Sequence, residues 1–197
     1  KLAHPVHQVD VFRRLIEGKA LCWNRQSKEP EGKGPIIYCI DESGSMSGTP
    51  IAWGKAVGLV LYREACLRKQ PFLYVRFASG SAVSAELLKG EPTDYQRLLE
   101  LSIQFYDGGT DYNLAFVTIM GFMDNKSRVP DSSKFKKADI VFVSDGIYPA
   151  KADDPLLMRF RAFLKDMEMK CYGINVGLPA DSFKLFCKSC WMLDMDS

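Results

Sequence analysis

The sequence predicts an α/β fold with a doubly wound, mostly parallel sheet of six strands, one antiparallel edge strand, and helices on both faces. Two observations predict this architecture. Short apolar runs of strand length alternate with longer segments of helical pattern, as in chains built from βαβ units. Most of these runs are apolar at nearly every position, which is typical of parallel strands covered on both faces. With 197 residues, 47% apolar and 25% charged, the chain has the size and composition of one globular domain.

The N-terminal part differs from the rest, and we expect residues 1–34 to form a helix and a linker ahead of a main domain at 35–197. A helical stripe runs through residues 6–18 and consists of Val6, Val9, Phe12, Leu15 and Ile16. Residues 24–34 are rich in Lys, Glu, Gly and Pro, as linkers often are. Because the chain starts at Lys1 and not at Met, we also consider this part as the end of an upstream region.

Six runs have the length and apolar content of strands. They are residues 36–40, 72–77, 82–88, 140–144, 170–176 and 190–194. The short Ser-Gly-Ser turn between the second and third runs makes that pair antiparallel. The helical segments between the other runs allow parallel pairing.

Helical signals fill the segments between the strands. We expect helices at residues 50–69, 93–104, 112–123 and 155–167, and a short one at 181–188. Thr49 is predicted to cap the first of these, with Pro50 at its first position. Gly54 and Gly58 are four residues apart, which would let this helix lie close against the sheet. Residues 124–138 are predicted to be a polar loop.

Oxygen-bearing side chains follow two of the predicted strands. Asp41, Ser43 and Ser45 come at every second position after the first strand, so in extended backbone they share one side. Asp145 follows the fourth strand, and Thr110 lies in a Gly-Gly turn that opens a helix. Ligands of open α/β sheets bind beyond the carboxyl ends of the strands, where the strand order reverses. If the first and fourth strands are neighbours, two carboxylates and three hydroxyls meet in one crevice.

Such a set of hard oxygen ligands suits Mg²⁺, with Mn²⁺ or Ca²⁺ as alternatives, better than zinc or copper. A bound cation would also remove the repulsion between clustered carboxylates. A nucleotide cofactor is not expected. Residues 48–56 resemble a phosphate-binding loop, but five residues separate its glycines where four are needed.

These residues resemble a known family. The motif "DESGS", Thr110 in "GGTD" and Asp145 in "SDG" resemble the metal-ion-dependent adhesion site (MIDAS) of von Willebrand factor A (VWA) domains, and the resemblance covers residues 35–194. It implies the Rossmann-like VWA fold. The "GGTD" loop, the cysteine in the first strand and the "VSDG" end are most similar to bacterial intracellular ViaA and CoxE-like proteins, which work with MoxR-type AAA+ ATPases.

The resemblance also implies a function. Ser43, Ser45 and Thr110 would coordinate the metal directly or nearly so, and Asp41 and Asp145 directly or through water. A partner protein would then supply an Asp or Glu to the open coordination position. We therefore expect a metal-dependent protein-binding adaptor, with a MoxR-type AAA+ ATPase as the partner.

Two acidic neighbours of these residues receive other roles. Asp111 is predicted to cap the helix that follows it. Glu42 points away from its neighbours by strand alternation, and we place it at the rim of the site or in solvent.

Two other classes of function stay open. An RNA-associated scaffold of the Ro type, which also carries this domain, would show a basic patch; the basic cluster here is Lys134, Lys136 and Lys137, in a polar loop. A metal-dependent hydrolase would use the same carboxylates. The two histidines, His4 and His7, lie near the N-terminus, so the usual general base is missing from the predicted site. We therefore expect no catalytic residues and no enzymatic activity.

The overall charge gives no bias toward nucleic acid or membranes, since 26 basic residues face 24 acidic ones, a formal net charge of +2. No apolar stretch approaches the ~20 residues of a membrane span, and no signal peptide is recognisable.

The six cysteines favour a reducing compartment, and we expect a cytoplasmic protein with six reduced thiols. Cys39, Cys66 and Cys171 lie in apolar runs and are interpreted as small buried hydrophobic residues. Cys187 and Cys190 have the spacing of a metal or redox pair, but zinc would need two more ligands and the sequence has no second such pair.

Overall fold

A computed structural model describes residues 34–124, 132–145, 152–177 and 182–193. The chain separates into two units after Lys33, and all described residues belong to the second, Gly34–Ser197. The predicted helix at 6–18 and both histidines therefore lie outside the described residues.

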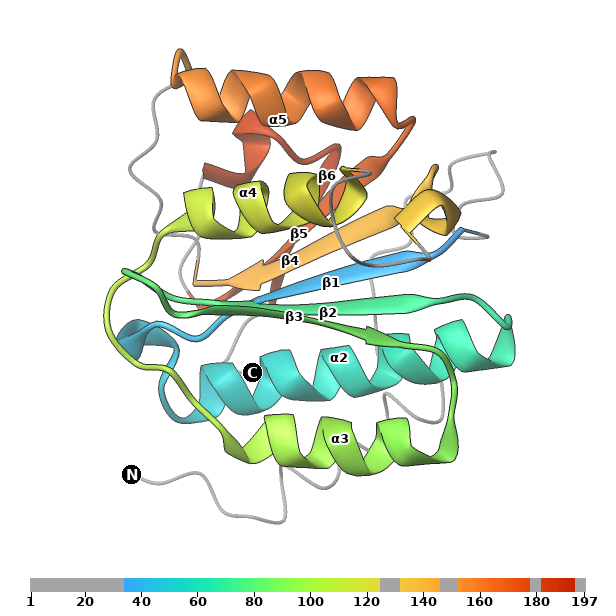
Figure 1. Ribbon diagram of the computed structural model, residues 1–197. Coiled ribbons are helices and arrows are strands. Elements are labelled where there is room, and N and C mark those ends of the chain that lie inside the picture. The colour runs from blue at the N-terminus through green and yellow to red at the C-terminus, as the bar shows by residue number, and fades with distance from the viewer. Residues whose placement is uncertain (1–33, 125–131, 146–151, 178–181, 194–197) are drawn as a thin grey trace. The chain divides into compact units, whose positions relative to one another are not determined.

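Six strands form one sheet (Figure 1). They are β1 (Ile36–Asp41), β2 (Phe72–Phe77), β3 (Val83–Leu88), β4 (Asp139–Ser144), β5 (Lys170–Val176) and β6 (Ser189–Leu193). Their order is β3-β2-β1-β4-β5-β6; β2 and β3 are antiparallel, and all other neighbours are parallel. The predicted sheet of six strands with one antiparallel edge strand is confirmed.

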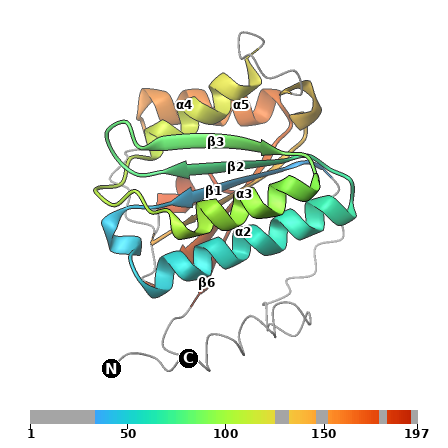
Figure 2. The same ribbon diagram turned by 60° about the horizontal axis from the view of Figure 1, so that its bottom comes forward.

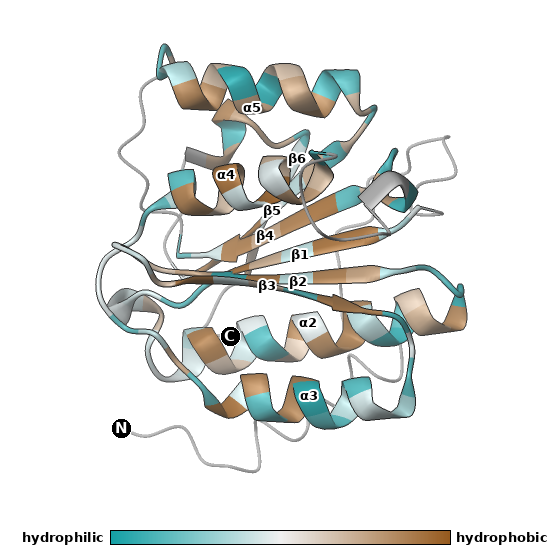
Figure 3. Ribbon diagram, in the orientation of Figure 1, coloured by the Kyte–Doolittle hydropathy of each residue, from teal (hydrophilic) through white to brown (hydrophobic). Residues whose placement is uncertain are grey.

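Helices cover both faces of this sheet. They are α2 (Thr49–Leu67), α3 (Pro92–Ile103), α4 (Tyr112–Met123) and α5 (Pro155–Asp166), with short 3-10 helices η1 (Gly44–Met46), η2 (Ser132–Phe135) and η3 (Ser182–Leu185). α2 and α3 lie side by side on one face, and α4 and α5 lie on the other (Figures 1 and 2). Apolar residues therefore run along the central strands (Figure 3), and every residue of β1 and β2 is buried.

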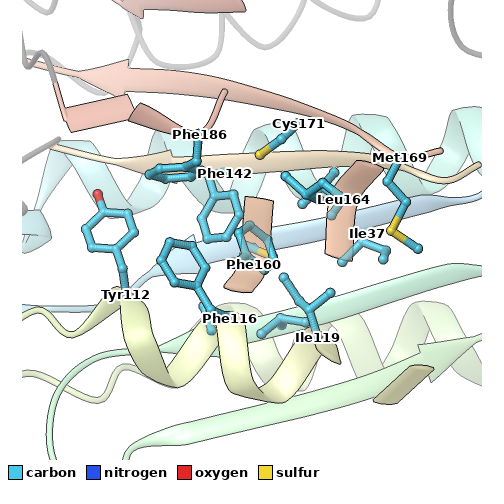
Figure 4. Close-up of a cluster of buried hydrophobic side chains, with 14 of the residues drawn as sticks. Ile37, Tyr112, Phe116, Ile119, Phe142, Phe160, Leu164, Met169, Cys171 and Phe186 are labelled. Carbon is cyan, nitrogen blue, oxygen red and sulfur yellow. The ribbon is translucent and has the colours of Figure 1, made fainter. Parts of the chain in front are cut away.

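Aromatic side chains fill the space between sheet and helices. Between the sheet and α4–α5, Phe116 stacks on Phe160 with ring centroids 4.2 Å apart, and Phe142 meets Phe116 edge-on at 5.9 Å (Figure 4). On the opposite face, Tyr62 packs edge-on against Phe72 at 5.6 Å. The aromatic residues of β1, β2, β4 and β5 are thus core residues, whereas Trp191 of β6 is exposed.

α2 approaches the sheet closely because it has two glycines on its inner side. A Cβ at Gly54 would lie 2.8 Å from Cδ1 of Ile40, and one at Gly58 would lie 2.8 Å from Cε1 of Tyr38. The Tyr38 hydroxyl donates a hydrogen bond to the carbonyl oxygen of Gly54. The predicted close approach is confirmed.

The ends of α2 differ from the prediction. Its N-cap is Gly48 and not Thr49, because the chain enters the helix with a φ of 83° at residue 48, which favours glycine. The helix ends at Leu67, before the predicted Lys69, and Lys69 itself has a φ of 54°.

Two predictions near the C-terminal half need correction. Residues 124–138 are not all polar loop, since η2 lies within them and Phe135 is fully buried against the α4–α5 core. Burial of this ring anchors the segment just before β4. The short helix predicted at 181–188 is the four-residue η3, in 3-10 form.

The five described cysteines are free thiols. Cys39 and Cys171 are buried as predicted, whereas Cys66 is only partly buried. Sγ of Cys171 lies 3.4 Å from Sγ of Cys187, and Cys190 is exposed. Among the described residues, no helix has the length and apolar content needed to cross a membrane.

Candidate metal centre

The candidate site lies at the carboxyl edge of the sheet, between β1 and β4 (Figure 1). After β1 the chain continues to β2 and β3 on one side, and it then returns to β4 on the other side of β1. The strand order therefore reverses between β1 and β4, which is where ligands bind in doubly wound folds. Asp41 ends β1, and Asp145 follows β4, so the two predicted carboxylates come from adjacent strands.

Ser144, the last residue of β4, links the two carboxylates. Its hydroxyl donates to Oδ2 of Asp41 at 2.6 Å and lies 3.5 Å from Oδ1 of Asp145. The other oxygen of Asp41, Oδ1, accepts from the backbone N–H of Ser43 at 2.9 Å. Asp41 is fully buried and Asp145 is 9% exposed. The first carboxylate is thus held on both oxygens, and the second lies nearer to solvent.

The two predicted serines are brought together by η1. Ser43 is extended, with φ −70° and ψ 162°, and the chain then turns so that the Oγ atoms of Ser43 and Ser45 lie 3.2 Å apart. Met46, also in η1, is fully buried and fixes the turn to the core. The convergence was predicted from extended backbone throughout, but a 3-10 turn produces it.

The segment that carries Thr110 is tied to this turn by its backbone. The N–H of Gly44 donates to the carbonyl oxygen of Gly108 at 2.8 Å, and the N–H of Asp111 donates to the carbonyl oxygen of Ala78 at 3.0 Å. Thr110 lies between these two anchors and is partly exposed. Asp111 caps α4 by accepting from the N–H of Asn113 at 2.9 Å, which confirms its predicted role.

Burial affects the pKa of two groups at the site. It raises the pKa of Asp41 above the ordinary aspartate value, while the hydrogen bonds from Ser144 and Ser43 lower this pKa and the negative charge of Asp145 raises it. Burial also raises the pKa of Tyr112 well above its usual value, and the charge of Asp41 raises it further. Figure 4 shows Tyr112 at the edge of the aromatic cluster, with its hydroxyl turned away from Phe116.

Sequence reasoning missed Ser144 and Tyr112. Ser144 directly precedes the predicted site residue Asp145, and Tyr112 lies two residues after the predicted site residue Thr110. A hydroxyl at the end of an otherwise apolar strand was the available signal for Ser144.

The placement of Glu42 was wrong. It is fully buried, and its carboxylate accepts two hydrogen bonds from Arg76, from Nε at 2.8 Å and from Nη2 at 2.6 Å. Nζ of Lys55 lies 3.6 Å from the same carboxylate, and we call these three residues the Glu42 cluster. Alternation does turn Glu42 away from its neighbours, but α2 and α3 cover that side. Arg76 in a buried strand and Lys55 in a buried helix were the signals for a buried acid.

The oxygen set at this edge fits a hard divalent cation such as Mg²⁺. Among the described residues, it offers two carboxylates joined through Ser144 and a pair of hydroxyls. Within the described ranges, no group of three or more His, Cys, Asp or Glu side chains could hold a metal ion. Neutral hydroxyls would therefore have to complete any coordination shell here.

Two solved structures share this architecture. The VWA domain of SpRpn10 superposes with a TM-score of 0.59, covering 82% of this chain and 88% of that domain at 10% identity. The fold is that of a VWA domain. Proximal thread matrix protein 1 from the mussel byssus superposes with a TM-score of 0.56, covering 83% of this chain and 42% of that protein at 13% identity. At these identities the likeness concerns the VWA fold alone.

Two uncharacterized proteins of Methanocaldococcus jannaschii are similar in sequence, with 28% identity over 184 residues and 29% over 138. The alignments cover 93% and 70% of this chain but 40% and 32% of those proteins. This chain therefore spans less than half the length of these two relatives. No protein-family model matches the chain. The closer similarity to ViaA and CoxE-like proteins stays a prediction.

An RNA scaffold would need the basic cluster of Lys134, Lys136 and Lys137. This cluster lies away from the candidate site, and Glu168 lies beside two of its lysines. The Glu168 carboxylate forms ion pairs with both, at 3.2 Å from Nζ of Lys137 and 3.8 Å from Nζ of Lys136. These pairs are exposed, and they partly neutralise the cluster.

Proposed function

We propose that this VWA-fold domain is a metal-dependent protein-binding module. In this proposal Asp41, Ser43, Ser45, Thr110 and Asp145 hold one divalent cation, with Mg²⁺ as the first candidate and Mn²⁺ or Ca²⁺ as alternatives. The observation that supports it best is the convergence of two carboxylates and a hydroxyl pair at the point where the strand order reverses.

Each residue has a role that follows from its contacts. Asp41 is fixed on both oxygens by Ser144 and by the Ser43 N–H, so its carboxylate is preorganised. Ser43, Ser45 and Thr110 would contribute neutral oxygens, and a cation bound mainly through these hydroxyls keeps part of its positive charge. A bound cation would offer an open position that attracts a carboxylate from another protein.

The partner is therefore a protein with an Asp or Glu side chain at its contact surface. The resemblance to ViaA and CoxE-like proteins supports a MoxR-type AAA+ ATPase, for which this domain would be an adaptor. We propose binding and not catalysis, because no histidine lies among the described residues to take a proton from Ser43 or Ser45.

Calorimetric titration with Mg²⁺ and Mn²⁺ tests the site. Asp145→Asn is expected to lose binding, because it removes half of the carboxylate charge without a change of shape. Asp166→Asn is the matched control, since Asp166 is an exposed aspartate at the end of α5. Equal affinity of wild type and Asp145→Asn would refute the site.

The partner is tested by measuring the affinity for a purified MoxR-type ATPase with Mg²⁺, with EDTA, and for Ser43→Ala. The proposal expects tight binding in the first case alone. Binding that is the same in all three would place the contact elsewhere on the domain.

A further inference from the structure

The Glu42 cluster has a second set of contacts, on the segment that leads from α3 to Thr110. Nη1 of Arg76 donates to Oε1 of Gln104 at 2.8 Å. The Arg76 guanidinium also lies over the ring of Tyr106, with Cζ 4.5 Å from the ring centroid. Arg76 thus uses one side of its guanidinium for Glu42 and the other for this segment.

Lys55 binds main-chain oxygens at the end of α3 and at the start of the same segment. Its ammonium group donates to the carbonyl oxygens of Leu101 at 3.3 Å and Ser102 at 2.9 Å, and to that of Gln104. Carbonyl groups in the last turn of a helix have no partner within the helix, and a cation there is favourable. Lys55 is therefore a buried cap for the C-terminus of α3.

The far end of the segment is held by Gly44, the first residue of η1. Gly44 donates its N–H to the carbonyl oxygen of Gly108 at 2.8 Å. The contact is close, since a Cβ at Gly44 would lie 2.7 Å from Oδ1 of Asp107. Glu42 and Gly44 flank Ser43 in sequence. Both neighbours of Ser43 thus hold the segment that carries Thr110, one through Arg76 and the other directly.

We infer that the Glu42 cluster positions the 104–111 segment, and with it Thr110, against Ser43, so that cation affinity is coupled to the order of this segment. The inference rests on the proposed function of the metal centre. The coupling is reciprocal: a cation orders residues 104–111, and loosening this segment weakens cation binding by the same factor.

The alternative explanation is that the Glu42 cluster only stabilises the fold. Buried ion pairs are weak evidence for stability, because well-packed apolar residues often stabilise a core as well or better. In that case, loss of the contacts of the cluster would change the melting temperature and would leave the cation affinity unchanged. Cation affinity therefore distinguishes the two explanations, provided that the substitutions do not alter the charge near the site.

The test uses two uncharged substitutions in the full chain, Gln104→Ala and Tyr106→Leu. Each removes one contact of Arg76 with the segment and leaves the Glu42–Arg76 pair intact. Mn²⁺ affinity, measured by calorimetry, is expected to fall about 3- to 10-fold in each variant, less than the roughly 10- to 100-fold loss typical of groups that contact a metal ligand directly. Hydrogen exchange adds a second measurement: Mg²⁺ should protect the amides of 104–111 in wild type and less in the variants.

Arg97→Ala is the matched control. Arg97 lies on α3 and pairs with Glu86 of β3 at 2.6 and 2.5 Å, so this variant loosens α3 away from the segment. It should keep wild-type Mn²⁺ affinity. Wild-type affinity in Gln104→Ala and Tyr106→Leu, with no effect of Mg²⁺ on exchange in 104–111, would refute this inference alone. A wild-type chain that binds no cation would refute the proposed function and this inference with it.

Discussion

Replacing Glu42 by Ala is expected to lower the free energy of unfolding by about 3–5 kcal/mol. The side chains of Arg76 and Glu42 are 2% and 0% exposed, so water cannot replace the lost carboxylate. Two charge-assisted hydrogen bonds disappear, and the guanidinium stays buried without its counter-charge. Lys55 loses the same carboxylate at 3.6 Å, which adds to the cost.

Glu86→Ala is the comparison that isolates burial. The Arg97–Glu86 pair has the same two-bond geometry, but its side chains are 43% and 24% exposed. Water and salt screen such a pair, which contributes about 0–1 kcal/mol. The two variants should therefore differ by about 2–5 kcal/mol although the lost bonds are chemically alike.

Urea titration followed by intrinsic fluorescence in metal-free buffer measures both free energies, with calorimetry for the melting temperature. A loss of 3–5 kcal/mol corresponds to a drop of roughly 6–20 °C for a domain of this size. Losses that agree within about 0.5 kcal/mol for the two variants would show that burial does not set the energy of the Glu42–Arg76 pair.

Three further outcomes are expected. Because the pKa of Asp41 is raised in the fold, the contribution of Asp41 to the stability of the metal-free protein declines as pH rises through that pKa. Asp41→Asn should therefore match or exceed the wild-type melting temperature at neutral pH and lose that advantage in acid. Mg²⁺ should not raise the melting temperature of this variant. Thiol counting after denaturation without reductant should give six thiols, and mild oxidation with diamide should first join Cys171 and Cys187, whose sulfurs are 3.4 Å apart. Gly58→Ala should destabilise by about 1–3 kcal/mol because its Cβ meets two tyrosine rings, whereas Gly121→Ala, which has open space, should be neutral or stabilise by up to about 1 kcal/mol.

The elements that sequence located well are those whose signal is local. β2, β5 and α4 have the predicted bounds, because each is an apolar run with a local end signal in the sequence: Pro71 before β2, Gly177 after β5, and Asp111 and Asp124 around α4. The predicted start of α2 was wrong by one residue. The position of the N-cap depends on the backbone angle φ at Gly48, which a pattern of side chains does not predict. Phe135 was missed because one aromatic residue in a polar stretch has no period.

The candidate site was predictable only in part for a different reason. The convergence of Asp41 and Asp145 depends on β1 and β4 being neighbours, and strand order is a property of the whole sheet. Glu42 shows the same limit: alternation gives the side to which a residue points, but not the element that covers that side. The buried partners of Glu42 come from residues 55 and 76, far along the chain.

The hydroxyl of Ser144 also provides a natural reporter of the site. Ser144 and Asp41 are both fully buried, and the 2.6 Å bond between them encloses the hydroxyl proton. A proton shielded in this way exchanges slowly with water and should give a resolved resonance in the proton NMR spectrum. Since the same hydroxyl lies 3.5 Å from Asp145, its chemical shift senses both carboxylates. A cation that enters between the strands would therefore move this one signal, without any label on the protein or on a partner.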